Sequence, residues 1–156
     1  MPRLDRLSEL ARKTLQTHTV LVYDDAPWTA LNKPLKDCRV ALVTTAGMHV
    51  RGDHPFTGGE QNFRVIPADT LPKDIVLSHT SIGFDRSGVL RDINLVLPLD
   101  RLREMTEAGE IAGVGPNHYS FLGAQRKYDG LQGESGPEVG RRLKHEGVDA
   151  VLLTGT

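Results

Sequence analysis

Three short runs of consecutive apolar residues stand out from an otherwise polar chain. They lie in residues 38–46, 75–79 and 149–153, and the last contains the unbroken run Ala150–Leu153. Apolar runs of this length without polar alternation are typical of strands that are covered on both faces in a parallel sheet. Each run is followed by a polar turn that contains glycine or serine. We therefore predict that the three segments are strands of one mainly parallel sheet.

Apolar residues at helical spacing predict three helices. Residues 3–16 place four leucines on one face and most charges elsewhere, which indicates an amphipathic helix. A second helix is predicted over residues 98–109, with proline at its start and glycine at its end. The third is predicted over residues 135–146, because Ser135 and Glu138 fit a capping box. Helix and strand then alternate at the end of the chain.

This alternation predicts an α/β fold: a three-layer, mostly parallel, Rossmann-like sheet with helices on both faces. The domain is expected over residues 38–156, after an N-terminal helix and connecting arm over residues 1–37. The weaker patterns predict a short strand, a further strand or extended run, a turn and a mobile loop, at residues 63–66, 92–97, 111–115 and 124–134 respectively.

Composition narrows the class of protein. The chain has 156 residues and a net charge of −1, which gives no electrostatic reason to expect binding to nucleic acid or to an anionic membrane. A single cysteine, Cys38, excludes an intramolecular disulfide and fits a reducing compartment. The sequence shows neither the apolar core of a signal peptide nor a run long enough to span a bilayer. We expect a soluble cytoplasmic protein.

The sequence contains no complete catalytic motif: no phosphate-binding loop, dinucleotide fingerprint, nucleophile elbow or zinc-type cysteine pair. Cys38 opens a predicted strand, so we expect a structural role for it. Arginines are candidates for clamping a carboxylate, although exposure to solvent is the commoner fate of such residues. They are Arg51, Arg64, Arg86 and Arg91.

Histidines near predicted strand ends are the main candidates for chemistry. With Asp53 and Asp92 they could form a mononuclear metal site, but their spacing is irregular; they are His49, His54, His79 and His118. Alternatively, they hydrogen-bond to the loop backbone and orient strand ends, or one or two bind a substrate carboxylate or transfer protons. Because parallel strands end at one sheet edge, we expect His49 and His79 to flank Thr154–Thr156.

Several segments, taken in order along the chain, together form a recognisable pattern: Val43–His49, Arg51–Asp53 with Pro55 and Phe56, Arg64–Asp69, Ser78 and His79, Asp92–Asn94, Pro98–Leu102, His118–Gly123 and Lys144–Val151. No segment alone is a specific motif, but together they cover most of residues 38–156. In this order they resemble the selenoprotein B family of glycine, sarcosine, betaine and D-proline reductases.

The resemblance implies a subunit that reductively cleaves a C–N bond. In such proteins the strand like Asp149–Thr156 delivers a selenocysteine, whose selenolate attacks the carbon bearing the amine so that the C–N bond breaks. The selenium is then released as a selenenyl sulfide, which thiols reduce. The resemblance also implies other reductase subunits as partners, one with a pyruvoyl group in several members, together with a thiol reductant system and a small amine or amino-acid substrate. A homo-oligomer is a further expectation.

The family places its selenocysteine directly after the residue that corresponds to Thr156. We therefore expect that the chain is truncated, lacks its nucleophile and is inactive alone, with no cofactor or metal of its own. The candidates for substrate binding or proton transfer are Thr45, His49, Arg51, His79, Asp92, His118, Thr154 and Thr156. Two alternatives stay open: a metal-dependent hydrolase or lyase that uses the histidines, and a non-catalytic assembly module.

Overall fold

The computed structural model describes residues 3–17, 22, 24 and 29–155, and the chain divides into two compact units, residues 1–30 and 31–156. In the first unit a short 3-10 turn, η1 (Leu4–Arg6), precedes helix α1 (Glu9–Gln16). The Ser8 side chain accepts a hydrogen bond from the Ala11 amide, so the predicted helix begins at Glu9 rather than at residue 3. Residues 18–21, 23 and 25–28 of the predicted connecting arm lie outside the described residues.

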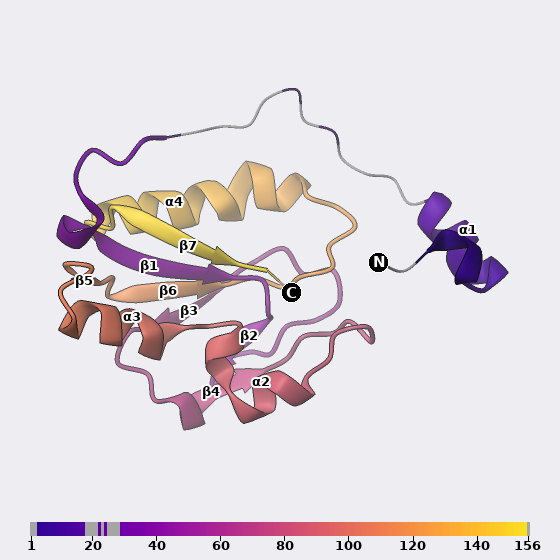
Figure 1. Ribbon diagram of the computed structural model, residues 1–156, viewed down its shortest axis with the longest axis horizontal. Helices are drawn as coiled ribbons and strands as arrows, with labels where there is room; N and C mark the ends of the chain where they lie inside the picture. The colour runs from indigo at the N-terminus through magenta and orange to yellow at the C-terminus, as the bar shows by residue number, and fades with distance from the viewer. Residues whose placement is uncertain (1–2, 18–21, 23, 25–28, 156) are drawn as a thin grey trace. The chain divides into compact units, whose positions relative to one another are not determined.

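The second unit is built on a mixed five-stranded sheet (Figure 1). Its central strand, β1 (Arg39–Thr44), pairs in parallel with β5 (Gly113–Val114), β6 (Asn117–Ser120) and β7 (Ala150–Thr154). Strand β3 (Arg64–Pro67) pairs antiparallel with β6. The α/β class and the strands at 38–46 and 149–153 are thus confirmed, whereas the mostly parallel, three-layer Rossmann-like arrangement stays a prediction.

The third predicted strand of the parallel sheet is elsewhere, so that part of the prediction is wrong. Strand β4 (Ile75–Leu77) pairs antiparallel with β2 (Met48–Val50) in a separate two-stranded sheet. The cause is local: Gly47 has a φ of +66°, which turns the chain sharply after β1. After this turn, the chain forms β2, which pairs with β4, where only a polar turn was predicted.

Strand β7 also differs from its prediction, because it is not a central strand covered on both faces. Within the described residues it pairs only with β1, and it forms an edge of the sheet. Val151, Leu152 and Leu153 are 40%, 43% and 73% exposed. An apolar run therefore predicts a strand correctly here but not the covering of its faces.

Helices pack on both faces of the larger sheet (Figure 1). Helix α3 (Leu99–Glu107) and the short helix α2 (Ser87–Arg91) contribute to one apolar cluster with Val40 and Leu42, and helix α4 (Gly136–His145) contributes to another with Ala41. Successive residues of β1 thus supply the two cores in alternation, as the pleat requires. None of the described helices has the length and apolar character needed to cross a membrane.

Several local expectations are corrected. Residues 93–95 form a 3-10 turn, η4 (Ile93–Leu95), rather than a strand, because the Asp92 carboxylate accepts the Asn94 amide hydrogen bond. Residues 113–114 form β5 rather than a turn. Part of the predicted loop at 124–134 is a helical turn, η5 (Leu131–Ser135), that continues into α4. Two further 3-10 turns are η2 (Leu35–Asp37) and η3 (Pro72–Asp74).

The predicted capping box of α4 is absent because η5 continues into this helix without a break. Ser135 is already helical, and its hydroxyl donates to the Gln61 carbonyl at 2.7 Å instead of capping. The other end of α4 follows the prediction. Gly147, with a φ of +70°, and Val148 donate to the Lys144 and Leu143 carbonyls, which is the Schellman pattern.

Candidate functional site

The carboxyl ends of three parallel strands meet at one edge of the sheet. Thr44 of β1 is in register with Ser120 of β6 on one side and with Thr154 of β7 on the other. The turn predicted after residue 153 therefore lies beside the turn after β1, as expected. In α/β sheets this edge is where ligands bind and reacting groups are positioned.

Hydroxyl groups fix the backbone at this edge. The Thr44 Oγ1 accepts the Ala46 amide at 3.2 Å, and the Ser120 Oγ accepts the Met48 amide at 2.7 Å. Both hydroxyl side chains are fully buried. Since buried polar groups are costly unless paired, these contacts specify one path for the chain as it leaves β1.

The end of β7 is held from two directions. Its Thr154 carbonyl accepts the Thr45 amide at 3.0 Å, and its Thr154 hydroxyl donates to the Val96 carbonyl at 2.7 Å. Two of the predicted site residues, Thr45 and Thr154, are therefore adjacent. Thr156, a third, lies outside the described residues, so the predicted closeness of His49 and His79 to it stays a prediction.

The segment after β4 reaches the same turn. The Ser78 amide and hydroxyl both donate to the Gly47 carbonyl, at 2.9 and 3.0 Å. A Cβ at Gly47 would lie 3.1 Å from the His79 Cα, so only glycine permits this approach. The backbone of His79 is thereby placed against the loop that leaves β1, although β4 belongs to another sheet.

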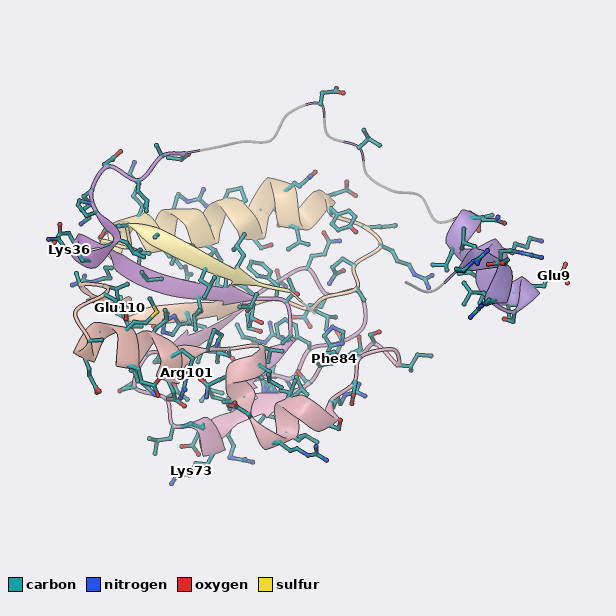
Figure 2. The ribbon with its side chains drawn as sticks, in the orientation of Figure 1. Glu9, Lys36, Lys73, Phe84, Arg101 and Glu110 are labelled. Carbon is teal, nitrogen blue, oxygen red and sulfur yellow. The ribbon has the colours of Figure 1, made fainter. Side chains whose placement is uncertain are left out.

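His79 is a buried, neutral imidazole with one polar atom unused. Its ring is 4% exposed and lies 4.6 Å, between centroids, from Phe84, which Figure 2 labels in the segment after β4. Nδ1 accepts the Ser81 amide at 3.1 Å, so the proton of the neutral ring lies on Nε2, which has no partner among the described residues. Burial and then Arg86 lower its pKa. His79 can thus donate a hydrogen bond at neutral pH.

His49 lies in different surroundings. It is on β2 opposite Val76, is 4% exposed, and leaves its Nδ1 without a partner among the described residues. Burial lowers its pKa, with Asp53 opposing and Arg64 reinforcing that shift. Its neighbours are thus the loop after β2 and strand β3, whereas those of His79 are Phe84 and Arg86.

His118 fills a break in the sheet rather than lining its edge. Residues between β5 and β6 interrupt the ladder along β1, and the His118 Nδ1 accepts the Leu42 amide at 3.0 Å in that interval. The ring is fully buried, and burial, then Arg103, lowers its pKa to about 4. This contact fits the alternative in which a histidine hydrogen-bonds to the backbone instead of binding substrate or metal.

Arg51 and Asp92 are each hydrogen-bonded to the backbone. The Arg51 guanidinium donates to the Lys73 carbonyl at 3.0 Å, and Figure 2 shows Lys73 at the opposite end of the two-stranded sheet from the site. Asp92 caps η4 and lines a cavity beside it. The described residues contain no group of three histidine, cysteine or acidic side chains that could hold a metal ion. Cys38 is fully buried.

A basic loop at the same edge was missed by sequence reasoning. After β6, Ala124 has a φ of +55°, unusual for a residue with a side chain, and the exposed Arg126 and Lys127 line a cavity of about 280 Å³ with Gln61. The adjacent positive charges are visible in the sequence. The backbone conformation that presents them is not, because alanine carries no turn signal.

Comparison with known proteins decides the family. Residues 7–156 match the family described as glycine/sarcosine/betaine reductase selenoprotein B. The chain belongs to this selenoprotein B family. The match covers the whole sheet, so the resemblance drawn from the ordered segments is confirmed.

Curated relatives of the selenoprotein B chain are subunits of amino-acid reductases. The D-proline reductase subunit gamma of Acetoanaerobium sticklandii is 42% identical over 144 residues, which cover 91% of this chain and 59% of that protein. The sarcosine reductase complex component B subunit beta of Peptoclostridium acidaminophilum is 29% identical over 139 residues, 86% of this chain and 32% of that protein. The chain thus spans well under two thirds of these relatives. No solved structure matches it significantly.

Proposed function

We propose that this chain is part of the substrate-reducing subunit of an amino-acid reductase complex, of the D-proline type. The D-proline reductase subunit is 42% identical, and it aligns with 91% of the chain. Subunits named for sarcosine, glycine and betaine reductases are more distant, at 27–29% identity. The metal-dependent alternative is not favoured, since the described residues form no metal-binding group.

One observation carries the proposal: the end of β7 is fixed at the edge where β1 and β6 also end. The hydrogen bonds of Thr154 to the Thr45 amide and the Val96 carbonyl set its direction. A reactive residue that follows Thr156 would start from a rigid support, as a nucleophile needs. We propose that this residue is a selenocysteine, that the full-length protein continues beyond it, and that the sheet completes a Rossmann-like arrangement.

The proposed chemistry balances with two thiols as the reductant. The selenolate attacks the carbon that bears the amine, a C–Se bond forms, and the C–N bond breaks as the nitrogen takes up a proton. A thiolate then attacks selenium, the carbon departs with the bonding electrons and is protonated, and a selenenyl sulfide remains. A second thiol restores the selenolate and releases a disulfide. With a cyclic amine such as proline, the product is a ring-opened amino acid.

The chain's own residues would supply binding and proton control. The neutral His79 has an Nε2–H group that can donate a hydrogen bond, and the His79 backbone lies beside the turn after β1. Thr45 lies next to the end of β7. Cys38, the only cysteine in residues 1–156, is fully buried and is not accessible as a nucleophile. We therefore infer that the 156-residue chain alone does not reduce the substrate.

Other reductase subunits and a cytoplasmic thiol system complete the proposed complex. A pyruvoyl group on a partner subunit would activate the amine. The proposal is tested by reading the nucleotide sequence after the Thr156 codon. The reading frame is then expressed with cysteine at the first selenocysteine codon, and thiol-dependent loss of D-proline is assayed against glycine, sarcosine and betaine.

Position-specific evidence comes from Thr154→Val, which keeps the shape but removes the hydroxyl that donates to Val96. We expect kcat to fall roughly 10- to 100-fold with little change in KM, because the nucleophile is misplaced. Thr106→Val is the matched control, since the Thr106 hydroxyl donates to a backbone carbonyl on α3, away from the edge. Equal activity of the two variants, or absence of any selenocysteine or cysteine codon after Thr156, would contradict the proposal.

A further inference from the structure

A cavity of about 320 Å³ lies between the two-stranded sheet and the segment that contains α2 and η4. Its apolar wall includes Met48, Leu77 and Val89, of which Met48 and Val89 are buried. Small-molecule sites occupy roughly 300–1,000 Å³, so this cavity suits a ligand with few heavy atoms. None of the hydroxyl residues that organise the carboxyl edge lines it.

Two opposite charges also line this cavity, and neither neutralises the other. Arg91 is exposed and makes no hydrogen bond or ion pair with any described residue. Asp92 uses its Oδ1 to accept the Asn94 amide at 2.9 Å and the Asn94 side-chain amide at 3.0 Å. Its Oδ2 has no hydrogen-bond partner among the described residues, and Arg101 acts on the carboxylate only through its charge. The Asn94 hydrogen bonds lower the Asp92 pKa, so the carboxylate is ionised at neutral pH.

A third charged group in the wall is already satisfied. The Asp100 carboxylate accepts hydrogen bonds from Asn94 at 3.1 Å and from Arg103 at 2.8 Å. The charges left for a ligand are therefore one guanidinium and one carboxylate, beside an apolar wall. A free anion or a free cation would leave one of them unmatched. A small molecule with both a carboxylate and an ammonium group would match both.

We propose that this cavity binds a small zwitterionic amino acid with an apolar body. Arg91 binds its carboxylate, the Asp92 Oδ2 accepts a hydrogen bond from its ammonium group, and Met48 and Val89 contact its carbon skeleton. That this ligand is also the substrate of the reductase rests on the proposed function; the binding itself does not.

Two hydrogen bonds connect the segments around the cavity to the carboxyl edge, and one of them runs from the Met48 amide to the Ser120 Oγ at 2.7 Å. Residues 93 and 94 of η4 line the cavity, and Val96, which ends η4, accepts the Thr154 hydroxyl at 2.7 Å. Occupation of the cavity therefore bears on the segment that also holds the end of β7.

The test is a titration of the 156-residue protein with D-proline, followed by amide NMR shifts. We expect shifts at the cavity residues. D-prolinamide lacks the carboxylate and N-acetyl-D-proline lacks the ammonium group, so each should bind about 10- to 100-fold more weakly, the loss typical of one charge-assisted hydrogen bond. Binding of N-acetyl-D-proline equal to that of D-proline would overturn the role of Asp92.

Variants assign each charge. Arg91→Met should weaken D-proline by about the same factor and leave D-prolinamide unchanged. Arg141→Met is its control, because Arg141 pairs with Glu138 on the exposed side of α4. Asp92→Asn has a closer control in Asp85→Asn, since the Asp85 Oδ1 accepts the Ser87 amide at 2.9 Å in the same local geometry but outside the cavity.

Absence of shifts at the cavity residues, or equal weakening by Arg91→Met and Arg141→Met, would overturn the proposal. The results also distinguish a failure of the cavity proposal from a failure of the proposed reductase function. If a full-length complex reduces D-proline equally well with and without Arg91→Met, the cavity is not the substrate site of the reductase, and the reductase proposal stands. If D-proline binds as described in a protein without reductase activity, the cavity proposal stands alone.

Discussion

His118 should make the stability of the protein depend on pH in a defined window. Its folded-state pKa is about 4, against 6.5 for an exposed histidine, because burial disfavours the charged ring. The unfolded chain therefore binds a proton that the folded chain rejects between these two values. Stability from this group is complete above pH 6.5 and is lost as the pH falls toward 4.

The size of the effect follows from the pKa difference. A shift of this size corresponds to about 3 kcal/mol, all of which is lost only below both pKa values, and about 2 kcal/mol of it is lost between pH 7.5 and pH 5. His49 and His79 also have lowered pKa values, from burial first. Their contribution persists in a His118 variant, so the difference between the two proteins isolates His118.

Two variants separate the proton from the hydrogen bond. His118→Asn keeps an acceptor oxygen where the ring places Nδ1, near the Leu42 amide, but does not titrate. His118→Leu fills similar space without an acceptor and should cost a further 1–3 kcal/mol or so at pH 7.5, for a buried amide left unpaired. Urea unfolding at pH 7.5 and pH 5 measures both. A His118→Asn protein with the wild-type pH dependence would refute the assignment.

Two other substitutions test the turn after β1 and the edge of the sheet. Gly47→Ala should destabilise the protein by more than 1 kcal/mol or so beyond Gly52→Ala, measured by urea unfolding; both glycines have positive φ, but only Gly47 lies against His79. Equal costs would exclude the close approach as the reason for glycine. Leu153→Ser should reduce self-association in sedimentation velocity, since Leu153 is 73% exposed on an unpaired edge. The control Ile82→Ser, at another exposed apolar residue, should not reduce it. A wild-type protein that stays monomeric at high concentration would contradict this prediction.

The strands of the larger sheet could be predicted where the pattern is local. An unbroken apolar run correctly predicted β1. The run is unbroken because Val40 and Leu42 face one core while Ala41 faces the other. The same pattern misplaced β4. Whether a three-residue apolar strand joins one sheet or another depends on the partner that the turn at Gly47 presents, and that is a tertiary property.

The candidate site, too, could be predicted only in the part that depends on local sequence patterns. Thr45 and Thr154 could be placed together because parallel strands end at one edge. The histidines could not be distinguished from the sequence, since His79 and His118 both lie at or near strands. Burial in the folded structure lowers the pKa of both, so the pKa direction does not separate them either. What separates them is the backbone: the partner of His118 is an amide left free by a break in the ladder, which no sequence pattern reports.

The exposed face of β7 joins the fold to the proposed function. The apolar run is enough to predict a strand here, yet Leu152 and Leu153 remain exposed. Apolar strands on an open edge associate with further chain. A subunit whose relatives are longer, and whose reacting residue is proposed to follow β7, would cover this edge with the same segment that carries the nucleophile. Covering the edge and positioning the nucleophile would then be one folding event, so full-length protein should bury Leu153 whenever it is active.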